Sequence, residues 1–269
     1  MFQPESLSND CLHLRQQSPL ILNITNYVAM SLSANALLAA GASPLMSSEP
    51  EEMTELVKAS DALVINIGCL EQRQSEAMAI AARAAMEQGK PWVLDPAGAG
   101  LSRLRRETVA RLISEFHPCV IRGNASEIMV LAGEKAASRG VDSAEGSEAA
   151  VGAASRLASE TGAVISLSGG IDFITDGRTV IKLYGGSPMM PRVTAMGCAA
   201  SALTAAFLAV DEDRLAASAS AMALMGAAGE KAASESNGPG SFAVNFIDAL
   251  ASLNPEAAAK SLRYEQESA

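Results

Sequence analysis

Short runs of mainly apolar residues alternate along the chain with longer segments in which apolar positions recur at helical spacing. A short run rich in Val, Ile and Leu is typical of a strand that is buried on both faces. We predict strands at 19–24, 61–67, 91–95, 119–121 and 162–168. Two further runs, 171–175 and 178–184, flank Asp176-Gly177, a pair that favours a tight hairpin turn.

The segments between the strands predict helices. We expect helices at 27–40, 71–87, 102–116, 125–132 and 147–160, and the first of them should end at Gly41. Ser48-Glu49-Pro50-Glu51 has the pattern of a capping box before another helix. Residues 135–147 are small, polar and charged, which indicates a surface loop. The C-terminal third is mostly helical, with an interruption at Asn237-Gly238-Pro239-Gly240.

Strands that alternate with helices predict a mainly parallel sheet that is covered by helices on both faces. No internal repeat or linker divides the chain, so we expect one domain over residues 1–269. Ligands bind such sheets beyond the carboxyl ends of the strands. The loops that follow the predicted strands are therefore the places to look for function.

Composition narrows the function classes. The net charge of −10 at pH 7 disfavours nucleic acids and anionic membranes as partners. No export signal and no apolar run of about 18 residues is present, so we expect a cytoplasmic protein with free thiols. The four cysteines show no zinc-ligand spacing, and the two histidines stand in no catalytic motif.

Two acidic motifs follow predicted strands. Asp95 precedes the small residues Pro96-Ala97-Gly98-Ala99-Gly100, so its carboxylate either binds Mg²⁺ in an open cleft or caps a turn. Arg122-Gly123-Asn124 follows the next strand, and Glu127 stands three residues after Asn124, as in a capping box. The cap explains Asn124 and Glu127 but not Arg122, which suits nucleotide phosphates.

A third motif opens an Ala-rich helix at Gly197-Cys198. The free N–H groups of a helix start, at Gly197 here, form an anion site that suits a transferring phosphoryl group. The same helix end should lower the pKa of the Cys198 thiol, although a buried structural cysteine is the alternative. Asn26 and Gly68 follow two further strands, where Asn26 could cap a helix and Gly68 would permit close approach of a ligand.

The chain resembles the hydroxyethylthiazole kinase family in segments that occur in family order and cover nearly its whole length. They are NITNYVAMSLSANALLAAGASPLM (23–46), DALVINIGCL (61–70), PWVLDPAGAG (91–100), IRGNASEIMVLAG (121–133), SLSGGIDFITDG (166–177), MGCAASALTAAF (196–207) and GPGSF (238–242). The resemblance implies a ribokinase-like three-layer α/β/α fold with a mainly parallel central sheet. It also implies ATP-dependent, Mg²⁺-requiring phosphorylation of the primary hydroxyl of 4-methyl-5-(2-hydroxyethyl)thiazole in thiamine salvage, by a homotrimer with active sites at subunit interfaces.

The resemblance also assigns expected roles. The thiazole pocket is expected near Asn26, Met46, Gly68 and Ala195. The nucleotide is expected at Arg122 and Ser168, beside the helix start at Gly197, and the metal at Asp95 and Glu127. Cys198 stands where most ribokinase-like enzymes have the Asp that deprotonates the acceptor alcohol, and hydroxyethylthiazole kinases typically have Cys there.

The chain departs from the family before this helix. The family usually reads Thr-Gly-Thr-Gly-Cys or Thr-Gly-Ala-Gly-Cys, whereas this chain reads Thr194-Ala195-Met196-Gly197-Cys198. If position 195 has a positive φ, Ala costs on the order of 1 kcal/mol there. Met196 could narrow the pocket.

Three alternatives stay open, the first of them because of Ala195-Met196. They are a related kinase for another small alcohol such as hydroxymethylpyrimidine, an ATP-dependent repair dehydratase for hydrated nicotinamide cofactors, and an inactive ligand-binding homologue. Cys198 in place of Asp disfavours the first two, and the joint presence of Asp95, Arg122, Glu127 and Cys198 argues against the third.

Overall fold

A nine-stranded sheet forms the centre of the computed structural model, which describes residues 2–134 and 144–269. Its strand order is β2-β1-β3-β4-β5-β6-β7-β8-β9. The strands are β1 (Leu20–Ile24), β2 (Ser43–Met46), β3 (Ala62–Asn66), β4 (Trp92–Asp95), β5 (Val120–Asn124), β6 (Val164–Ser168), β7 (Asp172–Thr175), β8 (Thr179–Tyr184) and β9 (Arg263–Ser268). The strands from β2 to β6 in this order are parallel, whereas β7, β8 and β9 pair antiparallel with their neighbours.

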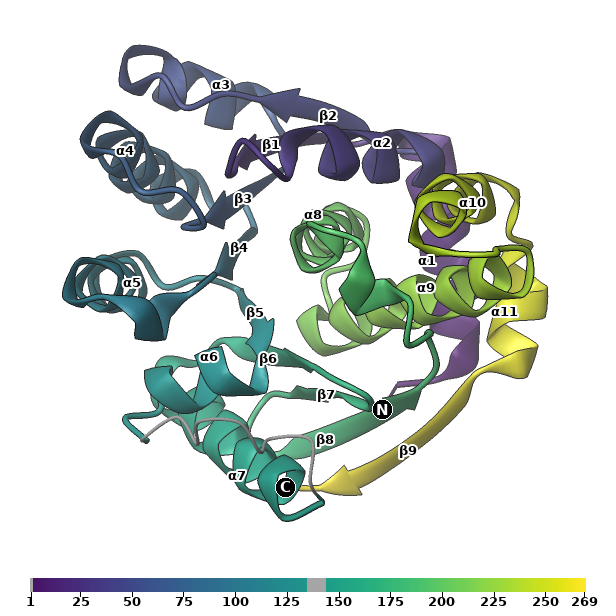
Figure 1. Ribbon diagram of the computed structural model, residues 1–269. Helices are drawn as coiled ribbons and strands as arrows, with labels where there is room; N and C mark the ends of the chain where they lie inside the picture. The colour runs from purple at the N-terminus through teal and green to yellow at the C-terminus, as the bar shows by residue number, and fades with distance from the viewer. Residues whose placement is uncertain (1, 135–143) are drawn as a thin grey trace.

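Helices cover both faces of the sheet (Figure 1). One face packs against α3 (Met53–Ala59), α4 (Gln72–Gln88), α5 (Arg103–Phe116), α6 (Ala125–Leu131) and α7 (Ala144–Thr161). On the other face, α2 (Met30–Ala40), α8 (Met196–Leu208) and α9 (Arg214–Ser234) contact the sheet. Further helices pack outside them, namely α1 (Pro4–Gln17), α10 (Pro239–Ser252) and α11 (Pro255–Ser261). The predicted three-layer α/β/α architecture is confirmed.

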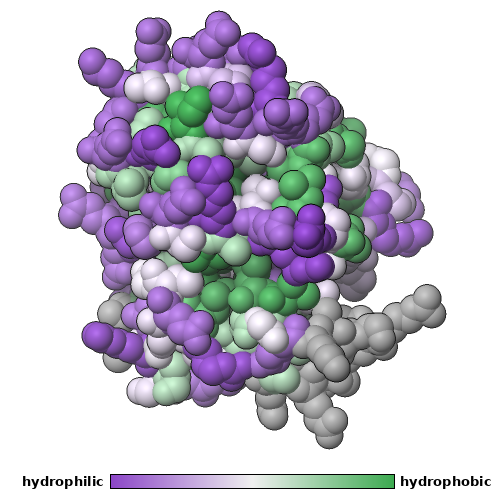
Figure 2. Space-filling model, turned by 90° about the vertical axis from the view of Figure 1, so that its left-hand side faces the viewer, coloured by the Kyte–Doolittle hydropathy of each residue, from purple (hydrophilic) through white to green (hydrophobic). Residues whose placement is uncertain are grey.

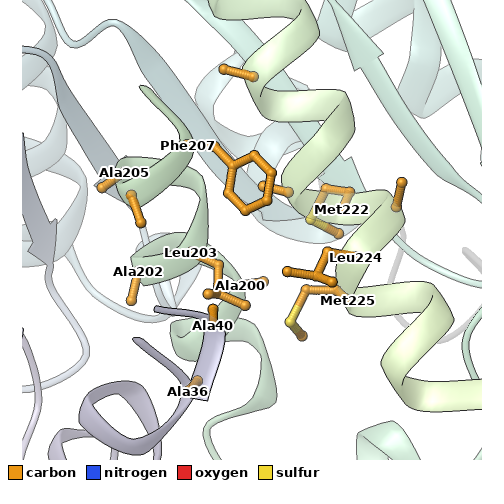
Figure 3. Packing of buried hydrophobic residues seen from close by; sticks show 14 of the residues in the cluster. Ala36, Ala40, Ala200, Ala202, Leu203, Ala205, Phe207, Met222, Leu224 and Met225 are labelled. Carbon is orange, nitrogen blue, oxygen red and sulfur yellow. The ribbon is translucent and has the colours of Figure 1, made fainter. Parts of the chain in front are cut away.

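Alanine-rich surfaces let α8 lie close to its neighbours. Figure 3 shows Ala200 and Leu203 of α8 near Ala36 and Ala40 of α2, with Phe207 turned toward α9. Small side chains allow helix backbones to approach each other, so apolar area is buried without large residues. All residues of α8 from Ala199 to Leu208 are buried, which fixes this helix rigidly against the sheet.

The predicted strands and helices occur at the expected places, and the hairpin turns at Asp176-Gly177 as predicted. Residues 135–143 of the predicted surface loop lie outside the described residues, and α7 begins at Ala144. The prediction of a capping box at 48–51 is wrong. Pro50–Glu52 forms a short 3-10 helix, and Ser47 rather than Ser48 accepts a hydrogen bond from the Glu49 N–H.

The outer face of the layer formed by α3, α4 and α5 is largely hydrophilic, with apolar side chains between the charged ones (Figure 2). This pattern is the usual one for amphipathic helices that pack on a sheet. Within the described part of the chain, none of the helices is long and apolar enough to cross a lipid bilayer.

Asp10 is an unusual core residue, because it is 4% exposed and its Oδ2 has no hydrogen-bond partner. Burial raises the pKa of Asp10 to about 6. Ser220 of α9 and His13 lower this pKa in part, and the carboxylates of Asp211 and Asp213 raise it further. The folded state therefore binds this proton more tightly than the unfolded chain, and stability falls as pH rises from 3.8 to about 6.

We expect Asp10→Asn to stabilise the protein by on the order of 1–3 kcal/mol above pH 7, because the buried charge is removed. The gain should shrink toward pH 4, where Asp10 is already neutral in the folded state. Thermal unfolding at pH 8 and pH 4.5 measures both values, and the exposed Asp248→Asn serves as the control. An equal effect at both pH values would contradict this account of Asp10.

Candidate active site

The predicted site residues gather at one edge of the sheet. Strands β1, β3, β4, β5 and β6 all end at this edge, because they are parallel, and α8 begins beside them (Figure 1). The register pairs Asn66 of β3 with Asp95 of β4, and Asn124 of β5 with Ser168 of β6. Side chains far apart in the sequence are thereby brought into one row.

Two asparagine amides hold the Cys198 thiol. The Nδ2 groups of Asn26 and Asn66 donate to Cys198 Sγ at 3.4 and 3.3 Å. Asn26 Nδ2 also donates to Asn66 Oδ1 at 3.0 Å, and Asn26 Oδ1 accepts the Ala29 N–H ahead of α2. Asn26 therefore contacts Cys198, but it does not cap α2, whose N-cap residue is Ala29 and has no side-chain cap.

Gly68 lies against this network, where a side chain has no room. A Cβ on Gly68 would lie 2.6 Å from Asn26 Nδ2 and 2.8 Å from Asn66 Oδ1. The Gly68 N–H donates to Asn66 Oδ1 at 2.8 Å. Asn66 thus joins Asn26, Gly68 and Cys198, although the sequence analysis gave it no role. Its position at the end of a buried strand was the available signal.

Asp95 and Arg122 form the charged part of the site. Asp95 is 3% exposed, and its Oδ2 accepts the Ser201 hydroxyl at 2.7 Å. Burial raises the pKa of Asp95 to about 6, the Arg122 guanidinium opposes the rise, and the Glu127 carboxylate adds to it. Ser201 is a second residue whose role is not evident from its sequence context. It stands one helical turn after Cys198, which places both on one face of α8.

Arg122 connects the ends of β5, β6 and α8. Its Nη2 donates to Ser168 Oγ at 2.6 Å, and its Nη1 would lie 2.6 Å from a Cβ at Gly197. Arg122 is 8% exposed, and its Nε has no hydrogen-bond partner. The three residues expected at the nucleotide are therefore together, and an unpaired buried donor suits an anionic ligand.

Glu127 forms the predicted capping box. Its Oε2 accepts the Asn124 N–H at 2.9 Å, while Asn124 Oδ1 accepts the Glu127 N–H at 3.0 Å. Its Oε1 accepts the Gly98 N–H at 2.9 Å, which ties the loop after β4 to α6. Both carboxylate oxygens already hold backbone groups, so any ion would contact Glu127 through the remaining lone pairs or through water.

The expectation that the helix start lowers the pKa of Cys198 and favours a thiolate is wrong. Burial raises the pKa of Cys198 to about 11, the nearby Asp95 carboxylate adds to the rise, and the Asn26 amide and the Arg122 guanidinium oppose it. At neutral pH the side chain is therefore a thiol. Desolvation and the neighbouring negative charge outweigh the helix start that the sequence emphasised.

Ala195 has a positive φ, which is the condition under which the sequence analysis expected strain at this position. It precedes α8 with φ 66° and ψ 9°, a left-handed conformation that costs a residue with a Cβ on the order of 1 kcal/mol. Met196 is 6% exposed and its side chain packs in the apolar core, which gives no support to the expected narrowing of the pocket.

We expect Ala195→Gly to stabilise the protein by about 0.5–1 kcal/mol, because relief of the left-handed strain exceeds the added entropy of the unfolded chain. The exposed helical Ala110→Gly should have the opposite sign and lose about 1 kcal/mol. Denaturant unfolding of both variants measures the two changes. A loss of stability in Ala195→Gly would contradict the strained conformation.

Met46 is the predicted site residue with the least direct link to the others. It ends β2 at the same edge, pairs with Asn23 of β1 and is half-buried. A separate cleft of about 680 Å³ lies on the outer side of α4, lined by residues that include Gln72, Glu76, Arg83 and Arg111. It contains none of the predicted site residues, so the candidate site stays at the sheet edge.

Comparisons with known proteins agree with this geometry. The family model of the hydroxyethylthiazole kinase family matches residues 11–256. A hydroxyethylthiazole kinase of Brachyspira hyodysenteriae is 48% identical over 259 residues, which are 96% of this chain and 98% of that protein. The structure of a hydroxyethylthiazole kinase protein from Pyrococcus horikoshii has a TM-score of 0.91 and 37% identity, with coverage of 98% and 99%.

A more distant structure extends the comparison to the fold. A ribokinase-like superfamily protein from Enterococcus faecalis has a TM-score of 0.68 with 14% identity, over 93% of this chain and 94% of that one. The expected ribokinase-like fold is therefore confirmed.

Proposed function

The chain belongs to the hydroxyethylthiazole kinase family, and we propose that it transfers the γ-phosphoryl group of ATP to the primary hydroxyl of 4-methyl-5-(2-hydroxyethyl)thiazole, in thiamine salvage. One observation carries the proposal. Cys198 opens α8 between two asparagine amides and one helical turn from the Ser201–Asp95 contact. A thiol at the acceptor position, where other ribokinase-like enzymes have Asp, favours the thiazole alcohol.

We assign the nucleotide phosphates to Arg122, Ser168 and the helix start at Gly197. The guanidinium supplies a fork of donors, and its unpaired Nε supports an anion at this place. The N–H groups of the first turn of α8 have no intrahelical partners and add partial positive charge. These groups would neutralise charge on the transferring phosphoryl group.

Asp95 and Glu127 fit Mg²⁺. Among residues 2–134 and 144–269 no three His, Cys, Asp or Glu side chains form a metal cluster, and Mg²⁺ commonly uses one or two carboxylates, with water and phosphate as its other ligands. Asp95 is the better placed of the two, because the oxygens of Glu127 already hold backbone N–H groups. When bound, Mg²⁺ would neutralise phosphate charge.

The acceptor pocket is assigned to Asn26, Met46, Gly68 and Ala195. In the transfer, the hydroxyl oxygen bonds to the γ-phosphorus, the bond to the bridging oxygen of ADP breaks, and the hydroxyl proton leaves. A loose transition state needs little early deprotonation, so the small thiolate fraction of a group with a pKa of about 11 would be the form that takes the proton late, while the neutral thiol would only position the hydroxyl. Cys198 either takes this proton or only positions the hydroxyl.

We further propose that the protein works as a cytoplasmic homotrimer with active sites at the subunit interfaces. Tyr27 and Val28 support the assembly, since they follow Asn26 directly and are 56% and 63% exposed. ATP as co-substrate and four free cysteines are consistent with the cytoplasm. A monomer by light scattering at assay concentrations would contradict the assembly.

The direct test is substrate choice. Steady-state kcat/KM with MgATP is measured for the thiazole alcohol and for hydroxymethylpyrimidine, the alternative acceptor. The proposal predicts a clear preference for the thiazole. Turnover of the pyrimidine alone would mean that the site serves a related kinase reaction, and turnover of neither would indicate an inactive homologue.

A further inference from the structure

Arg105 joins two of the loops that build the site. From α5, its Nη1 donates to the carbonyl oxygens of Ile67 and Ala97, both at 2.7 Å, and its Nη2 donates to the Gly68 carbonyl at 2.9 Å. Ile67 and Gly68 belong to the loop after β3, here called the acceptor loop (residues 66–69). Ala97 belongs to the loop after β4, here called the phosphate loop (residues 95–98). One guanidinium therefore holds both loops.

The local structure places this side chain. Ser102 caps α5 by accepting the Arg105 N–H at 3.3 Å, which sets where the first turn begins. Gly98 has φ 68° and no side chain, and a Cβ there would lie 3.5 Å from Arg105 Nη1. The planar fork of a guanidinium can satisfy carbonyls on two backbones at once, which a single ammonium does less well.

The two loops carry opposite halves of the proposed reaction. The acceptor loop contains Gly68 and Asn66, which donates to Cys198. The phosphate loop contains Asp95, the proposed ligand of the Mg²⁺ that would neutralise the phosphate charge, and Asp95 accepts from Ser201. We infer that Arg105 is a positioning residue that sets the distance between the acceptor hydroxyl and the phosphoryl group. This inference rests on the proposed function.

A positioning role predicts a specific kinetic signature. In-line transfer is sensitive to misplacement of about 1 Å, whereas each half-site keeps its own binding groups when the clamp is lost. We expect Arg105→Gln to lower kcat at least about 10-fold while the Kd of each substrate alone stays within about 3-fold. Methylguanidinium added to Arg105→Ala should restore part of kcat.

Arg106→Gln is the matched control. Arg106 is the next residue in α5, it is exposed, and its Nη1 donates to the Gly100 carbonyl at 3.2 Å outside both loops. This variant should keep the wild-type kcat. If Arg105→Gln does not fold, Arg105→Lys is measured in its place. We expect this variant to have a lowered kcat and a Tm close to that of the wild type. A wild-type kcat in folded Arg105→Gln or in Arg105→Lys would overturn the inference.

Hydrogen exchange without substrate separates this inference from the proposed function. The Ile67 N–H donates to the Asp95 carbonyl at 3.2 Å, and the Ala99 N–H to the Pro96 carbonyl at 2.8 Å. Arg105→Gln should speed exchange in peptides covering both loops, and Arg106→Gln in neither. Unchanged exchange in the acceptor loop would refute the clamp even if wild-type protein turned over no thiazole. Faster exchange in both loops would support it in that case.

Discussion

Asp95→Asn is expected to lower kcat by about 10²–10³-fold, because the variant loses charge stabilisation of the transition state that corresponds to about 3–4 kcal/mol. Asp95 supplies the negative charge that suits Mg²⁺ at the end of β4, and an amide of the same shape does not. The folded protein should not lose stability. Burial raises the pKa of Asp95 from 3.8 to about 6, so its ionised form is disfavoured in the fold, and Asn removes that cost.

Steady-state kinetics and thermal unfolding of the same preparation check both halves of this prediction. Ser201→Ala is the matched control, because it removes the 2.7 Å hydrogen bond to Asp95 and leaves the carboxylate. It should cost only a few-fold in kcat, consistent with about 1 kcal/mol for one hydrogen bond. Asp95→Asn with near wild-type kcat would remove Asp95 from the reaction.

The second large effect is expected at Cys198. Cys198→Ala should lower kcat by about 10–100-fold, at or below the lower end of the range for general acid–base groups, because only a small fraction of Cys198 is thiolate at neutral pH. Cys198→Asp should equal or exceed the wild type at pH 7, since the Asn26 and Asn66 amides already point at this position and a carboxylate can accept from both.

The pH dependence distinguishes a base from a positioning group. With a thiol pKa of about 11, kcat of the wild type should rise between pH 7 and pH 9 if Cys198 takes the proton. Cys198→Asp should lack that rise. Cys119→Ala, at the opposite edge of the sheet before β5, should keep the wild-type kcat. Full kcat in Cys198→Ala would exclude any catalytic role of the thiol.

Much of the central sheet was predictable, because parallel strands buried on both faces leave continuous apolar runs such as 61–67. The two edge strands of the sheet, β2 and β9, were not predictable in this way. β2 is four residues long and contains Pro44, which only an edge strand tolerates. β9 consists mainly of polar residues, and Lys182 of β8 forms a salt bridge with Glu267 of β9.

The helix α1 was missed for a related reason. Its segment is mostly polar, and its buried residues Leu7, Cys11 and Leu14 form a narrow stripe with few apolar residues around it. The helix is stabilised by packing against α9 and α11, and these tertiary contacts cannot be recognised from the local sequence.

In the site, the sequence indicated the candidate residues but misjudged the environment of Cys198. Loop motifs at strand ends identified Asp95, Arg122 and Cys198, because the parallel topology sends every such loop to one edge. The thiol pKa depends on burial and on Asp95, which is 103 positions away in the chain, so the motif alone suggested the wrong direction. Asn66 and Ser201 acquire their roles only through contacts between different elements.

The central claim is that the cluster at the sheet edge phosphorylates the thiazole alcohol. Phosphorus NMR of wild-type protein with MgATP and 4-methyl-5-(2-hydroxyethyl)thiazole tests it most directly. The account predicts a new phosphomonoester resonance that grows in step with ADP and is absent with Asp95→Asn over the same period. ADP that appears only with inorganic phosphate, or a reaction mixture in which ATP is unchanged, would contradict it.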